Sequence, residues 1–368
     1  MNVLKVEVDM KNGGKDNLQS RAEQSRAEQS RAEQSRAEQS RAEQSREITL
    51  DILRGVAILI VVFGHAIQVS LLEGESSFLW SKIILNLQMP LLFCISGYTA
   101  GFSYPSSNTK KFIAKKIKRL LVPYIVWETL HYLLVCMVPG NYRVLSGGQF
   151  IKEFFVSDFW FLRVLFVYYI VLWLYNIFFN LFHIQEKVMQ SIFLLSGCVV
   201  IWMLMRVKLI NSLSVWYYIW FLIGLLFFKY KNILNVYKVK GTYKWIVLFV
   251  LGVIIAFGIR VNISSKILTM FLVVEISLII CVAANIIPEK IKDYLIHVGK
   301  NTLPVYGIHW CLLFSPIFRI NGYQLVRSIL PLYISAFFIA ILWMIVCEVM
   351  VWILMKNKMG RILFLGVR

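Results

Sequence analysis

The chain alternates long apolar segments with short polar ones. From residue 48 onward, apolar stretches of near 20 residues are separated by short segments rich in Lys and Arg. A helix needs roughly 20 residues to cross a bilayer, and it satisfies its own backbone polar groups there. The pattern predicts an all-α, polytopic membrane protein with about ten transmembrane helices. The predicted spans are residues 50–71, 79–103, 120–139, 159–182, 188–205, 213–228, 244–260, 266–287, 302–319 and 330–355.

Residues 1–47 differ from the rest because they are polar throughout. The pentapeptide SRAEQ occurs five times in tandem over residues 20–44. A period of five places no apolar stripe on a helix, so this segment cannot pack into a core. We expect a cytoplasmic tail, disordered or a lone helix, before a transmembrane domain at residues 48–368. No secretory signal precedes the first span, which is expected to act as its own uncleaved anchor.

Composition and charge support the membrane assignment. Apolar residues make up 58% of the chain and charged residues only 16%, which excludes an ordinary soluble domain. The net charge of +19 lies in short segments between the spans, which is typical of cytoplasmic loops and not of a nucleic-acid-binding surface. This bias predicts both termini on the cytoplasmic side of a cell membrane, with lipid as a partner. A bacterial cytoplasmic membrane is the expected location.

The six cysteines and five histidines give no sign of a metal site. The cysteines all fall within apolar segments and lack C-x-x-C spacing. The histidines have no ligand spacing such as H-E-x-x-H. We therefore interpret the cysteines as small core residues and expect no bound metal.

The first span carries ionisable residues that are costly in a bilayer. Arg54 and His65 are eleven residues apart, almost three helical turns, so they share one face about 16 Å apart along the axis. Charged groups in such a span are functional hypotheses by default. This pair would suit a long ligand with an anionic head and a reactive tip. The alternative is an Arg that extends to the membrane surface and a His that is satisfied by a neighbouring helix.

A second cluster lies near residue 300, in the segment GKNTLPVYGIH at residues 299–309. Pro304 suits the first turn of a helix, whose positive N-terminal end beside Lys300 would attract a phosphate. Tyr306 and His309 are one turn apart on one face. Two membrane-embedded histidines are harder to explain as core residues than one.

Several segments resemble the acyltransferase 3 family, integral membrane O-acyltransferases of the fucose O-acetylase-like kind. LDILRGVAILIVVFGH resembles its first helix, whose hallmark is a basic residue, ten intervening residues and a His. MPLLFCISGY, FIAKKIKRLLVPY, DFWFLRVLFVY and GKNTLPVYGIH resemble later elements. In the second helix, Pro and Gly are expected to interrupt the helix beside a cavity. One departure is Gln88, where family members often have His, because Gln forms hydrogen bonds but cannot titrate.

The resemblance implies an acyl-CoA donor, most often acetyl-CoA, as co-substrate. It implies a hydroxyl of a carbohydrate or other cell-envelope glycan as acceptor. We expect His65 to act as the base or as a transient acyl carrier, with His309 orienting it and Tyr306 donating a hydrogen bond. The expected phosphate-binding residues are Arg54, Lys116, Arg119 and Lys300, and the expected acceptor contacts are Arg163 and Gln88.

Other interpretations stay open at this point. A transporter or flippase of a glycan or lipid-linked substrate could use the same intramembrane charges, although the spans show no internal repeat. A membrane scaffold could use the repeat tail to bind a partner. Lys116 and Arg119 could anchor acidic lipid, and Arg163 could extend to the surface. Four more intramembrane residues could orient a His or Arg: Glu128, His131, Glu275 and Glu348. Two further histidines, His183 and His297, are expected in loops.

Overall fold

A computed structural model describes most of the chain after residue 47, and every structural statement below concerns its described residues. Within them the regular structure is helical, with no strand, as the sequence predicted. The predicted repeat tail lies outside the described part and stays a prediction. The described residues are 48–71, 79–103, 109–136, 147–156, 159–207, 210, 212–230, 250–255, 265–283, 286–313, 326–327 and 329–365.

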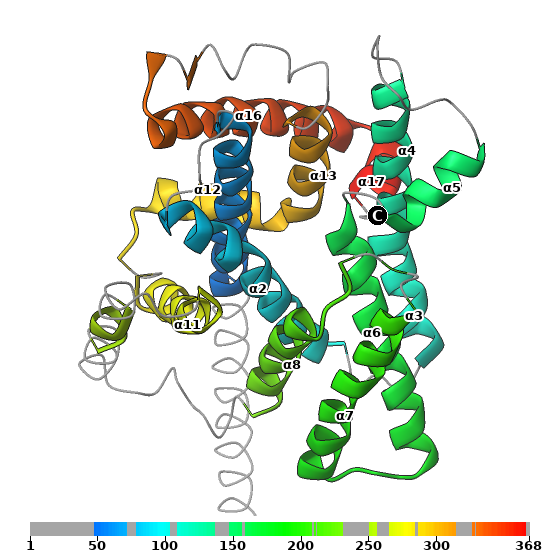
Figure 1. The fold of residues 1–368 in the computed structure, drawn as a ribbon. Helices are drawn as coiled ribbons and strands as arrows, with labels where there is room; N and C mark the ends of the chain where they lie inside the picture. Colours follow the sequence, from blue (N-terminus) through cyan, green and yellow to red (C-terminus); the bar gives the residue numbers. More distant parts are fainter. Residues whose placement is uncertain are drawn as a thin grey trace, which may run out of the picture. The chain divides into compact units, whose positions relative to one another are not determined.

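The helices follow the apolar pattern closely (Figure 1). Among the described residues, six helices are long and apolar enough to cross a membrane: Ile48–Ser70, Ile83–Gly101, Lys110–Cys136, Trp160–Leu181, Lys187–Arg206 and Leu332–Lys356. The polytopic character is thus supported, but the count of about ten spans is not confirmed. The first helix is Ile48–Ser70. The others are α2 Leu79–Gly101, α3 Thr109–Lys116, α4 Val122–Cys136, α5 Gly147–Val156, α6 Trp160–Leu181, α7 Lys187–Arg206, α8 Val215–Lys229, α11 Ser265–Ala283, α12 Glu289–Lys300, α13 Thr302–Leu313, α16 Leu332–Lys356 and α17 Lys358–Leu365.

The third span begins earlier than the sequence predicted. A π-helical turn, Ile117–Leu121, joins α3 to α4, and the Val122 N–H donates to the carbonyl of Ile117, five residues back. Pro123 follows and has no N–H, and its ring would clash with the carbonyl four residues back in a regular helix. The wider turn removes this conflict. The span therefore runs without a break from Lys110 to Cys136.

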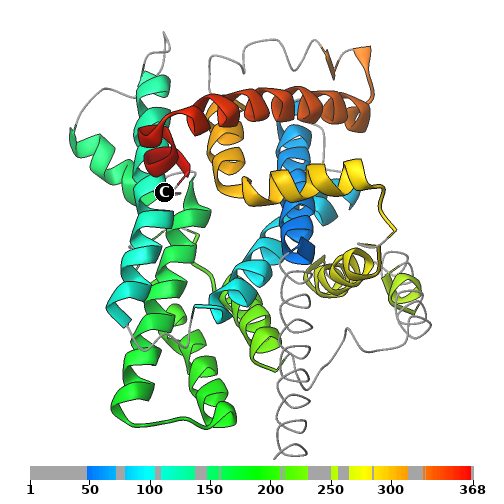
Figure 2. The same cartoon turned by 180° about the vertical axis from the view of Figure 1, so that it is seen from behind.

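The expected interruption of the second span is wrong, because α2 continues as one helix through Pro90. Its Gly97 instead allows a close approach to α8, beside which α2 lies in both views (Figures 1 and 2). A Cβ on Gly97 would lie 1.8 Å from the Phe221 carbonyl oxygen, and one on Gly224 would lie 1.9 Å from the Cys94 carbonyl oxygen. Small residues of this kind allow membrane helices to pack backbone against backbone.

A second glycine contact sets the height of α13 along the first helix. A Cβ on Gly299 would lie 1.8 Å from the Asp51 carbonyl oxygen, and one on Gly55 would lie 2.2 Å from the Leu295 carbonyl oxygen. The end of α12 therefore touches the first helix near its start. The chain turns at Asn301, and α13 then runs beside the first helix (Figure 1).

We predict that Gly224→Ala destabilises the protein, because the added methyl group would overlap the backbone of α2. Overpacking of this kind costs about 1–3 kcal/mol. The detergent-solubilised variant should unfold at a lower temperature than wild type. Gly148→Ala in α5 is the matched control, since nothing lies within 4 Å of a Cβ at that position. Equal melting temperatures for the two variants would contradict the predicted packing.

Candidate active site

The structure brings His65 and His309 into direct contact, although they are 244 residues apart. His65 Nδ1 lies 2.9 Å from His309 Nε2, and the two rings are nearly parallel, with 12° between their planes. Both side chains are buried, with 4% of His65 and none of His309 exposed. His65 lies fourteen residues beyond Asp51 on the first helix, and His309 lies seven residues after Thr302, where α13 begins.

The partners of the two rings assign their protons. His309 Nδ1 lies 2.8 Å from the Val305 carbonyl oxygen, which can only accept, so this nitrogen carries the hydrogen. In the neutral ring, His309 Nε2 then accepts the hydrogen bond from His65 Nδ1–H. The hydrogen of neutral His65 is thus on Nδ1. Its Nε2 has the lone pair that can take a proton from a hydroxyl group or attack an acyl carbon.

Aromatic rings surround the pair on the α13 side. The Trp310 ring meets the His65 ring edge-on, with centroids 4.8 Å apart, and the Tyr306 and His309 centroids are 5.7 Å apart. The centroid of the Phe159 ring lies 6.1 Å from that of Tyr306 and 6.3 Å from that of Trp310. Such apolar surroundings strengthen hydrogen bonds between buried groups. Sequence reasoning missed Trp310 and Phe159. Trp310 could have been found as the residue directly after His309, and Phe159 as the second residue of the segment DFWFLRVLFVY.

Gln88 also lies at this part of the first helix. Its side chain is 5% exposed, and a Cβ on Gly64 would lie only 2.5 Å from its Oε1. The amide of α2 therefore lies against the residue that precedes His65. The expected acceptor contact of Gln88 stays a prediction.

Arg163 was predicted to contact the acceptor, but it forms hydrogen bonds to other helices of the protein. Its Nη1 donates to the Tyr124 hydroxyl at 3.2 Å and to the Phe154 carbonyl oxygen at 3.0 Å. The Tyr124 hydroxyl donates to the same carbonyl group. These bonds join α6 to α4 and α5 through one buried guanidinium group. They favour a structural role for Arg163.

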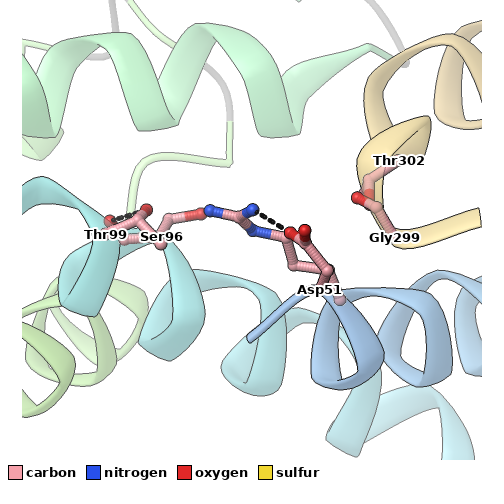
Figure 3. A network of polar contacts seen from close by, with 6 residues as sticks. Asp51, Ser96, Thr99, Gly299 and Thr302 are labelled. Carbon is pink, nitrogen blue, oxygen red and sulfur yellow. Dashed lines mark hydrogen bonds and ion pairs between the residues drawn. The ribbon is translucent and has the colours of Figure 1, made fainter. Parts of the chain in front are cut away.

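The four predicted phosphate-binding residues fall into two groups. Arg54 Nη1 donates to Asp51 Oδ1 at 2.7 Å, near the corner where the Thr302 hydroxyl donates to the Gly299 carbonyl oxygen at 2.7 Å (Figure 3). Lys300 is part of this corner and is exposed. Arg54 is only partly exposed, so a ligand at the corner would meet a guanidinium group already paired with a carboxylate.

Lys116 and Arg119 belong to α3 and the π-helical turn, which pack against α6. The Lys116 ammonium group lies 3.8 Å from the centroid of the Tyr169 ring, a cation–π contact. The Thr99 hydroxyl donates to the Ser96 carbonyl oxygen at 3.0 Å (Figure 3). The Tyr169 hydroxyl donates to the same oxygen at 3.2 Å. Lys116 therefore takes part in helix packing, whereas Arg119 is exposed.

Three other histidines were considered from the sequence. His297 was expected in a loop but lies in α12, and its Nε2 is 2.8 Å from Glu348 Oε2 of α16. His183 lies in an exposed turn after α6, as expected. His131 is buried in α4, with its ring 5.7 Å from that of Phe159.

Comparison with known proteins gives the family of the chain. The family model described as "Acyltransferase domain", that of the acyltransferase 3 family, matches residues 47–353. The chain belongs to the acyltransferase 3 family. This match confirms the resemblance found in the motifs. Together with the six apolar helices, it supports a membrane acyltransferase.

Two curated relatives have the same printed name. Nodulation protein NolL of Sinorhizobium fredii (strain NBRC 101917 / NGR234) is 29% identical over 122 residues, which is 32% of this chain and 33% of the relative. Nodulation protein NolL of Mesorhizobium japonicum (strain LMG 29417 / CECT 9101 / MAFF 303099) is 25% identical over 131 residues, 34% of this chain and 35% of the relative. The matched region thus spans about a third of the curated relatives. No solved structure matches.

We predict that Arg163→Gln and Tyr124→Phe each lower the melting temperature of the purified protein. Breaking a hydrogen bond to a buried charged group costs about 1.5–3 kcal/mol. Because both changes affect the same contact to Phe154, the double variant should lose less than the sum of the two losses. Fully additive losses would show that the two side chains act independently and would contradict the shared contact.

Proposed function

We propose that this protein is a membrane O-acyltransferase. It would move an acyl group, in the first instance acetyl, from acyl-CoA to a hydroxyl of a carbohydrate or cell-envelope glycan. Family membership supports the reaction class. The observation that carries the proposal is the buried contact between His65 and His309, because it holds two imidazole rings together inside a membrane domain.

In the proposed reaction, His65 Nε2 takes the proton of the acceptor hydroxyl. The hydroxyl oxygen attacks the thioester carbonyl carbon, the new C–O ester bond forms, and the C–S bond breaks. The proton then passes from His65 to the leaving sulfur, which gives free CoA. His309 would hold the ring of His65 in place through their hydrogen bond. Tyr306 would donate a hydrogen bond in the same pocket. Direct attack of Nε2 on the thioester would make an acyl-His carrier with the same nitrogen.

The donor would extend along the first helix. Arg54 lies near its start, about 16 Å from His65 along the axis, and Lys300 lies at the same corner. The N-terminal end of α13 adds a partial positive charge at this corner, which favours phosphate groups. Lys116 and Arg119 would be a second contact for the nucleotide. With the N-terminus inside, this corner would face the cytoplasm, where acyl-CoA is made, and His65 would lie deeper in the bacterial membrane.

We predict that His65→Asn abolishes acyl transfer. The Asn amide can still donate a hydrogen bond toward His309, but it has no basic nitrogen, and loss of a general base lowers rates about 10²–10⁴-fold. The measurements are release of CoA thiol and incorporation of labelled acetyl into envelope glycans, in membranes with matched protein levels. His183→Asn is the control, since this exposed His has a positive φ of 54° that Asn tolerates well.

Each outcome of this experiment has a clear meaning. Loss in His65→Asn with full activity in His183→Asn would support a catalytic His65. Unchanged acetylation with His65 replaced would contradict the proposal and favour a transporter or flippase. In that case, the variant should still alter movement of a glycan or lipid-linked substrate across the membrane.

We predict that Lys300→Gln raises the KM for acetyl-CoA several-fold and leaves kcat nearly unchanged. Loss of a contact made equally in the ground state and the transition state has this effect. The increase should shrink at high ionic strength, since the contact is exposed to salt. Lys290→Gln, at the other end of α12, is the matched control. Equal KM changes in both variants would point to a general surface charge effect.

A further inference from the structure

The amide oxygen of Gln88 lacks a hydrogen-bond donor among the described residues. Gln88 Oε1 is fully buried, in a side chain that is 5% exposed, and it accepts no hydrogen bond from them. Burying a carbonyl oxygen without a donor is unfavourable, so folded proteins pair nearly all such atoms. Other buried polar atoms of the described residues share this property, so the position of Gln88 decides what its donor could be.

The position of this oxygen relates it to the candidate active site. It lies against Gly64, where a Cβ would be only 2.5 Å away, and side-chain atoms of Ile84 and Leu85 would be 3.4 and 3.5 Å from that Cβ. The missing side chain of Gly64 therefore makes the room that the amide oxygen occupies. His65 is the next residue along this helix. The amide oxygen of Gln88 thus lies among apolar side chains, against the residue that precedes His65, the proposed base.

The chemistry of the oxygen limits what it can bind. A carbonyl oxygen only accepts, so the ligand must bring an N–H or an O–H group. Both proposed substrates have one: the pantetheine arm of acyl-CoA contains amide N–H groups, and the acceptor contains hydroxyl groups. We propose that Gln88 Oε1 accepts a hydrogen bond from an N–H or O–H group of the substrate near His65. This inference rests on the proposed function.

A selectivity follows from this arrangement. A substrate analogue without the N–H or O–H would leave the buried oxygen unpaired in the complex as well. Sites built to pair with a substrate donor reject such analogues strongly. Gln88 would therefore help to select the substrate without taking part in proton transfer, since an amide does not titrate.

The test is Gln88→Leu, which keeps a similar size and removes the oxygen. Transfer of labelled acetyl should fall at least 10-fold in kcat/KM, while the melting temperature should stay equal or rise, because an unpaired buried polar atom has been removed. A purely structural Gln would instead lose stability and activity together. Asn86→Leu is the matched control, since Asn86 is an exposed amide two residues away on α2. Unchanged kcat/KM in Gln88→Leu, or a lower melting temperature that alone accounts for the loss, would overturn the proposal.

Stabilisation by CoA separates the two possible donors. CoA should raise the melting temperature of the wild-type protein, because it binds the folded form. If the pantetheine N–H is the donor, this rise should be smaller in Gln88→Leu. If the acceptor hydroxyl is the donor, the rise should persist while transfer still falls. Either result supports a hydrogen bond to Gln88 and identifies which substrate donates it.

Failure of this inference can be told apart from failure of the proposed function. Retained transfer in His65→Asn would remove the acyltransferase mechanism. Retained transfer in Gln88→Leu together with loss in His65→Asn would remove only the role of Gln88. Gly64→Ala gives an independent check, since the added methyl group would displace the amide oxygen. Its kcat/KM should fall as in Gln88→Leu.

Discussion

The contact between the backbones of the first helix and α12 determines the geometry of the candidate site. Gly299 allows the end of α12 to touch the Asp51 carbonyl group of the first helix. Gly55 of the first helix likewise allows close contact with the Leu295 carbonyl group of α12. From this contact, the first helix and α13 rise side by side until His65 meets His309. A shift of one residue between them would move a histidine by about 1.5 Å and turn it by about 100°, which would break a hydrogen bond of 2.9 Å. The glycines therefore shape the candidate site without contacting it, because they fix the relative height of two helices.

Buried polar groups in the described helices differ in how they are satisfied. Arg163 is held by Tyr124 and Phe154, and His309 is held by Val305 and His65. In apolar surroundings such bonds hold helices in one arrangement, since an alternative arrangement would leave a polar group unpaired. Gln88 has no such bond from its oxygen to the described residues.

Much of the fold could be predicted from the sequence, because apolar length and helical periodicity are local properties. They gave the helical class, the shared face of Arg54 and His65, and the shared face of Tyr306 and His309. They could not give the contact between His65 and His309, since periodicity shows which residues share a face but not which faces meet. The continuous α2 was mispredicted for a related reason. Pro90 and Gly97 both suggested a break, but the packing of α8 against Gly97 supports the helix. The same limit explains His297, whose partner Glu348 is 51 residues away.

The order of hydrogen bonds in the histidine pair gives it a direction. The Val305 carbonyl group accepts from His309, His309 accepts from His65, and His65 is left with its basic nitrogen on the far side of the ring. This is the arrangement by which a catalytic triad fixes the tautomer of its base, with one difference. The group at the end of the chain is a neutral carbonyl and not a carboxylate. In the proposed reaction, the pair would act on an acyl donor that is already activated, as a thioester is, and not on an unactivated ester or amide.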